Sequence, residues 1–162
     1  MLGEHHYEIE LEWQGDRGTG TSGYRDYSRQ HVVRAAGKLH EIAGSSDRTF
    51  HGDRERWNPE ELLLAALGEC HMLSYLHVAT NHGVVVRSYT DQPTGTMRED
   101  GRGGGAFVEV VLRPQVEVED ASMLELAGAI HVEAAEKCFI AASVAFPVRH
   151  EPVVTVASVD RS

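Results

Sequence analysis

The sequence predicts an α+β fold in which a mostly antiparallel sheet packs on two central helices. Three observations lead to this prediction: short strands of alternating polarity come first, a long apolar helix lies mid-chain, and a hairpin, a second helix and a last strand follow. Strands that are grouped, instead of alternating one by one with helices, favour antiparallel pairing. The 162 residues suit one domain covering 1–162, because no linker or internal repeat divides them.

The first part of the chain predicts strands joined by polar turns. Apolar and charged residues alternate over 7–13, which is typical of a half-exposed strand. A turn rich in Gly and Thr follows over 14–23, and residues 31–36 form the next candidate strand. Residues 42–56 lack any periodicity, so we expect a polar loop there.

The central helix has several agreeing signals at its start. Asn58 can cap the free amides, Pro59 is tolerated in the first turn, and acidic residues suit the positive end of the helix dipole. We expect the helix to run from Pro59 to His82 and to end at Gly83. Residues 62–67 are apolar on every side, and such a helix belongs in an interior.

A hairpin, a helix and a strand complete the fold. Residues 84–97 predict a strand that is interrupted at Pro93, and residues 107–118 predict its antiparallel partner across a glycine-rich turn. Helical spacing of apolar residues predicts a second helix over Ala121–Cys138. Residues 152–157 predict the last strand.

Composition argues against several classes of partner. The net charge of −10 disfavours nucleic acid, because such binding depends on Lys and Arg that neutralise phosphates. The same sign disfavours anionic membranes, and no run reaches the roughly 18 consecutive apolar residues of a membrane span. Residues 1–6 lack the basic start and apolar run of a secretion signal. We therefore expect a cytoplasmic protein with no nucleic-acid or membrane partner.

The two cysteines, Cys70 and Cys138, are the residues most able to carry chemistry. They do not form a CxxC pair, which excludes a zinc ribbon or a thioredoxin-like motif. His71, His77 and His82 are spaced by six and five, so they scatter around the helix and predict no metal site. His71 points about 100° away from Cys70, which argues against a Cys–His dyad.

Two stretches around the cysteines resemble the OsmC/Ohr family, whose members include organic hydroperoxide resistance proteins. Residues 58–70 read Asn-Pro-Glu, an apolar alanine-rich helix and then a cysteine, with the family's spacing of ten from Glu60 to Cys70. Residues 134–138 resemble the second cysteine region. Tyr24-Arg25-Asp26 lies where the family places an Arg-Asp pair. The resemblance covers nearly the whole chain.

The resemblance implies an OsmC-like fold and a thiol-dependent peroxidase that reduces organic hydroperoxides. Cys70 would be the peroxidatic thiolate, which becomes a sulfenic acid, and Cys138 would resolve it as an intramolecular disulfide. No bound metal or other cofactor is implied. The family's usual reductant implies a dithiol co-substrate such as a dihydrolipoyl group, which a lipoylated protein can carry.

A cysteine on an apolar helix needs a nearby cation to become a thiolate at neutral pH. Arg25 is the candidate for this role, held by Glu60 through a bidentate ion pair. Arg29 is the alternative cation. Glu60 also stabilises the start of the helix through the dipole, whatever else it does.

Helix geometry and the resemblance together predict a homodimer. Ten residues of helix place Glu60 about 15 Å along the axis from Cys70 and on another face. A neighbouring subunit that packs antiparallel can bring its own Glu60 and Arg25 to Cys70. The family's intertwined dimers, with sites at the subunit interface, imply the same two-fold arrangement.

Two other functions are compatible with the same fold. One is a non-enzymatic binding protein for a small hydrophobic ligand, and the other is a redox sensor whose disulfide changes its partners. The family's best-characterised peroxidases often carry Phe after the first cysteine and Pro-Tyr-Ser after the second. This chain has His71 and Phe139-Ile140-Ala141 at those places, which indicates a less-studied subgroup.

Overall fold

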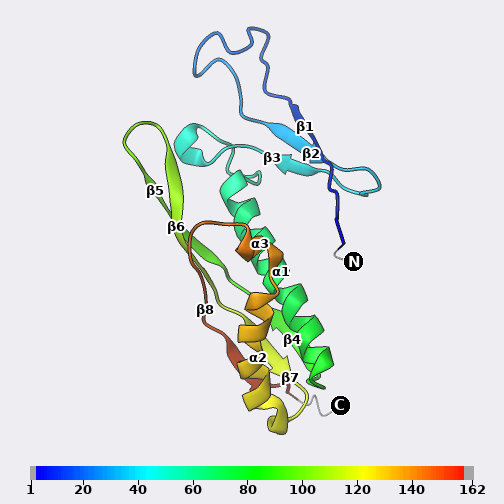
Figure 1. Cartoon of the computed structure of the whole chain (residues 1–162). Coiled ribbons are helices and arrows are strands. Elements are labelled where there is room, and N and C mark those ends of the chain that lie inside the picture. The colour runs from blue at the N-terminus through cyan, green and yellow to red at the C-terminus, as the bar shows by residue number, and fades with distance from the viewer. Residues whose placement is uncertain (1–2, 159–162) are drawn as a thin grey trace. The chain divides into compact units, whose positions relative to one another are not determined.

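A computed structural model describes residues 3–158 (Figure 1). We expected no secretion signal in residues 1–6, and residues 1–2 of that segment lie outside the described part. The chain divides into two units, residues 1–63 and 64–162, and the division falls within the long helix α1.

The first unit contains a three-stranded antiparallel sheet in the order β1-β2-β3. Its elements are β1 (Glu10–Trp13), β2 (His31–Arg34), β3 (Ile42–Gly44) and the short 3₁₀ helix η1 (Arg48–Phe50). The two predicted strands are present but shorter than expected. The expectation of a polar loop over residues 42–56 was wrong, because β3 and η1 lie within this stretch. The backbone of β3 pairs with β2 and bonds to Trp57, partners that the local sequence does not reveal.

The central helix α1 (Pro59–Asn81) confirms the sequence prediction at both ends. Asn58 accepts from the Glu61 amide at 2.8 Å, and the Glu61 carboxylate accepts in return from the Asn58 amide at 3.3 Å. This reciprocal cap satisfies two free backbone donors. The helix stops before Gly83, whose φ of +71° suits a glycine and closes the helix end.

The second unit carries two further three-stranded sheets, in the orders β4-β7-β9 and β5-β6-β8. Their strands are β4 (Val86–Thr90), β5 (Thr94–Glu99), β6 (Gly105–Leu112), β7 (Gln115–Val118), β8 (Val148–His150) and β9 (Val153–Val156). The predicted hairpin is confirmed in both sheets, since β4 pairs with β7 and β5 with β6, all antiparallel. The unpredicted strand β8 and the last strand β9 add parallel to β6 and β7.

The second long helix is shorter than the sequence predicts. A 3₁₀ turn, η2 (Ala121–Met123), leads into α2 (Leu124–Glu136), and a separate short helix, α3 (Phe139–Ala142), follows. The expected end at Cys138 was wrong. Cys138 has an extended conformation (φ −81°, ψ 102°) and caps α3, so the backbone turns between the two helices at this residue.

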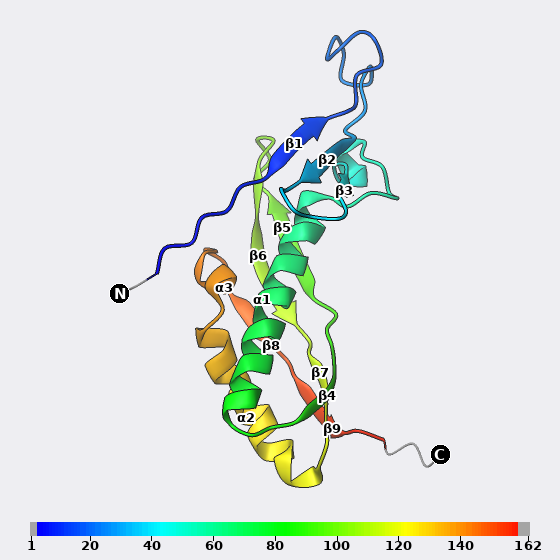
Figure 2. The same ribbon diagram turned by 90° about the vertical axis from the view of Figure 1, so that its right-hand side faces the viewer.

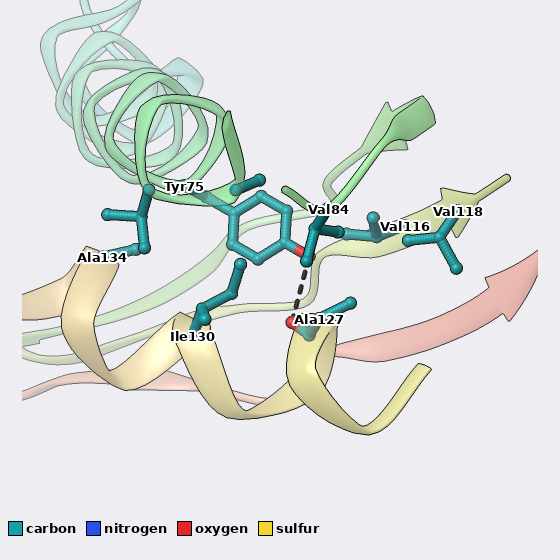
Figure 3. Close-up of a cluster of buried hydrophobic side chains, with 9 residues drawn as sticks. Tyr75, Val84, Val116, Val118, Ala127, Ile130 and Ala134 are labelled. Atoms are coloured by element: carbon teal, nitrogen blue, oxygen red, sulfur yellow. Dashed lines mark hydrogen bonds between the residues drawn. The ribbon is translucent and has the colours of Figure 1, made fainter. Parts of the chain in front are cut away.

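The core of the second unit lies between α1, α2 and the sheet β4-β7-β9 (Figures 2 and 3). Tyr75 is fully buried at its centre, and its hydroxyl donates to the carbonyl of Ala127 at 3.0 Å. This burial raises the pKa of Tyr75 to about 12. The side chains buried around it are Val78, Ala79, Val84, Val116, Val118, Ala127, Ile130 and Ala134.

By length and composition α1 is apolar enough to cross a membrane. The central helix of a soluble protein meets the same criterion. Part of α1 packs in the core of this unit beside α2, through Tyr75, Val78 and Ala79.

Candidate active site

Cys70 lies half-buried on α1 and lines a hollow of about 610 Å³ in the second unit. Helical spacing places side chains three, four and seven positions later on the same face of α1. The end of α2 and the start of α3 form the opposite wall. The residues that line the hollow with Cys70 are Leu73, Ser74, His77, Glu136, Lys137 and Phe139. Its surface is mainly apolar, with the thiol on one wall.

Cys138 lies beside Cys70 but is nearly inaccessible, with 2% of its surface exposed. Its sulfur accepts from the Ala141 amide at 3.4 Å, at the start of α3. Burial and a hydrogen bond with Cys70 raise the pKa of the Cys138 thiol to about 11. Both cysteines are free thiols. The structure therefore brings the two predicted cysteines together, one accessible and one covered.

Polar contacts tie the two helices together around the hollow. The Ser74 hydroxyl donates to the Lys137 carbonyl at 3.4 Å. The Lys137 ammonium pairs with Glu133 at 2.5 Å, and His82 contacts the other oxygen of Glu133 at 2.8 Å. These contacts hold the residues next to Cys138 against the face of α1 that carries Cys70.

The other predicted site residues lie in the first unit. Arg25 is exposed in a turn and makes no ion pair or side-chain hydrogen bond with the residues over 3–158. Arg29 is engaged instead, because its guanidinium donates to the carbonyls of Tyr27 at 2.9 Å and Tyr24 at 2.7 Å. It also lies over both tyrosine rings, at 4.3 and 4.5 Å from their centres. One carboxylate oxygen of Glu60 is buried without a hydrogen-bond partner among the described residues.

The structure contains a cluster of buried histidines that the sequence did not predict. His71 and His131 are 0% and 3% exposed, and Nε2 of His71 lies 3.0 Å from Nδ1 of His131. The His150 ring is centred 4.2 Å from that of His71, and Tyr75 stacks on His131 at 4.0 Å. The three histidines come from α1, α2 and β8, so spacing along one helix could not reveal them. Only the apolar surroundings of His71 and His131 in the sequence hinted at burial.

Burial governs the protonation of this cluster. Burial, together with the neighbouring His150 and His131, lowers the pKa of His71 to about 3. Burial and the neighbouring His150 lower the pKa of His131 to about 4, and burial also lowers the pKa of His150. All three imidazoles are therefore neutral at pH 7. Within residues 3–158, no group of three or more His, Cys, Asp or Glu side chains is arranged to hold a metal ion.

Comparison with known proteins places the chain next to one family. The family model described as OsmC-like protein matches residues 51–152, more than half of the chain. An OsmC-like protein of unknown function from Vibrio cholerae has 30% identity and a TM-score of 0.82, with 93% of this chain and 100% of that chain covered. No curated protein matches the sequence.

Two more distant structures share the fold. An organic hydroperoxide resistance protein from Legionella pneumophila is 18% identical, with a TM-score of 0.67 over 94% of this chain and 100% of that chain. A putative organic hydroperoxide resistance protein from Vibrio cholerae is 22% identical, with a TM-score of 0.60 over 96% of this chain and 95% of that chain. The latter structure has captopril bound in one of its active sites.

Proposed function

Since the chain belongs to the OsmC-like protein family, we propose that it protects against peroxides as a thiol-dependent peroxidase that reduces organic hydroperoxides. The observation that carries the proposal is the pair of free thiols, Cys70 and Cys138, side by side at an apolar hollow. The hollow suits the apolar body of an organic hydroperoxide. The names of the Legionella and Vibrio structures agree with a role in peroxide resistance.

The exposure of the two thiols supports Cys70 as the attacking residue. Cys70 lines the hollow, whereas Cys138 is covered and its raised pKa keeps it protonated at neutral pH. The thiolate, not the thiol, attacks electrophiles. A substrate in the hollow therefore meets Cys70 first, and Cys138 acts afterwards.

The reaction takes place in three steps. The Cys70 thiolate attacks the hydroperoxide, an S–O bond forms, the O–O bond breaks, and the alkoxide leaves as an alcohol after taking up a proton. Cys138 then gives up its proton as it attacks the sulfenic acid, a disulfide forms, and the hydroxyl leaves with that proton as water. A dithiol such as a dihydrolipoyl group reduces the disulfide by exchange and becomes a disulfide itself. The protein's own sulfur atoms carry the electrons.

Removal of the second thiol should stop the cycle after one oxidation. In Cys138→Ser, Cys70 still reacts once with cumene hydroperoxide, but no intramolecular disulfide can form. We expect wild type to consume cumene hydroperoxide continuously with dihydrolipoamide. The turnover of the variant should be at least about tenfold lower. Intact mass should show one added oxygen or its further oxidation products.

Three outcomes would contradict this account. Full turnover by Cys138→Ser would remove Cys138 from the mechanism. Wild type whose thiols both stay unmodified under hydroperoxide would favour the binding function, for which the apolar hollow of about 610 Å³ is the supporting observation. Stoichiometric oxidation without turnover by any dithiol would instead indicate a redox sensor.

We also propose that the active protein is a homodimer in which Arg25 and Glu60 of one subunit serve Cys70 of the other. Arg25 has no partner among the described residues, and one Glu60 oxygen is buried without a donor. Arg29 is already held by two carbonyls, which favours Arg25 as the activating cation. Leu73 and Phe139 at the hollow are 63% and 80% exposed, as expected of side chains that a second subunit covers.

Mixing two inactive variants tests the shared site. We expect Arg25→Ala to lose about a hundredfold of activity, because a charged donor to the reacting groups is removed. Cys70→Ser lacks the attacking sulfur. When the two are unfolded together and refolded, about half of the dimers are mixed and each has one intact site, so about a quarter of wild-type activity should return.

The matched control replaces the alternative arginine. Arg29→Ala alone should keep most of its activity per folded molecule, since Arg29 contacts its own loop. If Arg25→Ala were as active as wild type, Arg25 would not be the cation. If the mixture stayed inactive although native mass spectrometry showed mixed dimers, the site would not be shared between subunits.

A further inference from the structure

The buried pair His71 and His131 is not used by the proposed reaction, although it lies close to both cysteines in the chain. His71 follows Cys70 directly on α1 and faces the interior, whereas Cys70 faces the hollow. His131 lies two helical turns before Cys138 on the other helix. The bond between the two imidazoles therefore connects the backbone segments that carry the two thiols.

This bond is directional and has no substitute. Nε2 of His71 and Nδ1 of His131 lie 3.0 Å apart, so one ring donates and the other accepts. The remaining nitrogens, Nδ1 of His71 and Nε2 of His131, have no partner among the described residues. A slide of α1 along α2 would leave all four nitrogens unpaired in the interior. Unpaired buried polar atoms are costly, which favours one register of the two helices.

The same register serves the thiols. Tyr75 stacks on His131 and donates to Ala127, and Ser74 on the hollow side donates to the Lys137 carbonyl. On the partner segment, His131 lies between Ala127 and Lys137, the two residues that these contacts reach. We propose that His71 and His131 are a positioning pair that sets the separation of Cys70 from Cys138 and so the rate and equilibrium of their disulfide. The catalytic purpose of this positioning rests on the proposed peroxidase function.

The effective concentration of the two thiols measures the proposed role without any hydroperoxide. The protein is equilibrated with reduced and oxidised glutathione, and the fraction with the Cys70–Cys138 disulfide is measured by thiol trapping. Cys70 and Cys138 lose two electrons and two protons, and one oxidised glutathione becomes two reduced molecules. The equilibrium constant depends on how well the folded protein holds the two sulfurs together.

Two pairs of substitutions separate positioning from packing. His71→Leu together with His131→Leu removes both partners, so few polar groups are left unpaired and the fold should remain stable. We expect the effective concentration to fall about fivefold, which corresponds to the loss of one typical hydrogen bond. His71→Gln together with His131→Asn places amide nitrogen or oxygen where Nε2 and Nδ1 lie. This variant should stay within about twofold of wild type.

His150→Leu is the matched control. His150 is a half-buried histidine of the same cluster, yet it makes no hydrogen bond to α2 among the described residues. In His150→Leu, the effective concentration of the two thiols should equal that of wild type. If the double leucine variant does not fold, His131→Phe replaces it, because the phenyl ring can stack on Tyr75 but cannot bond to His71.

The inference is overturned if the leucine variant keeps the wild-type effective concentration, or if His150→Leu lowers it equally. A wild-type pair that forms no disulfide at any glutathione ratio would overturn it too. Failure of the proposed function looks different. In that case the glutathione results hold in every variant, but wild type does not consume hydroperoxide.

Discussion

Cys70→Ser should abolish hydroperoxide reduction, with a loss of at least about three orders of magnitude in turnover. A serine hydroxyl at this place is not ionised at neutral pH and cannot form a sulfenic acid. The hollow beside it should still bind substrate, because the rest of its wall is unchanged. The measurement is consumption of cumene hydroperoxide with dihydrolipoamide, at substrate concentrations that separate kcat from KM.

The same substitution at the other thiol provides the comparison. Cys138→Ser should complete its first oxidation, whereas Cys70→Ser should complete none. Thermal unfolding of both variants checks that the fold is intact. Residual turnover in Cys70→Ser above that of the uncatalysed reaction would assign the attack to another group, with Cys138 as the remaining thiol.

Acid should destabilise the protein well before its carboxylates are protonated. His71 and His131 have folded-state pKa values of about 3 and 4, whereas an unfolded histidine titrates near 6.5. Between these values the unfolded chain binds more protons than the folded one. The stabilisation is therefore complete above about pH 6.5 and is lost progressively as the pH falls through that window. Each of the two should cost about 2 kcal/mol of unfolding free energy by pH 5.

Urea unfolding at pH 7 and pH 5 measures this loss. The double variant His71→Leu/His131→Leu is the control, and its unfolding free energy should change much less over the same interval. The control keeps every other histidine, so the comparison isolates the contribution of His71 and His131. Equal stability of wild type at both pH values would show that the imidazoles are not buried as neutral groups.

Local signals in the sequence predicted the elements whose ends are set locally. Asn58 and Gly83 mark the ends of α1 because a cap and a left-handed residue act within one helical turn. Strands β3 and β8 were missed because each has three residues, and a sheet partner elsewhere in the chain fixes each one. The early end of α2 was missed because its apolar spacing continues to Cys138, although the helix ends at Glu136.

The candidate site also has a part that the sequence could predict and a part that it could not. The two cysteines could be singled out from the sequence because the motif around Cys70 is distinctive, and the structure places the second thiol beside it. The histidine cluster could not be predicted, because its members are far apart in the sequence. His131 comes 60 positions after His71, and His150 comes 19 positions after His131. The engagement of Arg29 by two tyrosines was also hidden, since it depends on how the loop before β2 folds.

Peptide mapping of wild type after one equivalent of cumene hydroperoxide tests the central claim most directly. The reduced protein is mixed with the hydroperoxide, free thiols are trapped, and the digest is analysed by mass spectrometry alongside assay of the alcohol product. The two-cysteine mechanism predicts one alcohol per disulfide and a linked peptide pair that contains Cys70 and Cys138. Recovery of both cysteines as trapped free thiols, with the hydroperoxide unconsumed, would contradict it.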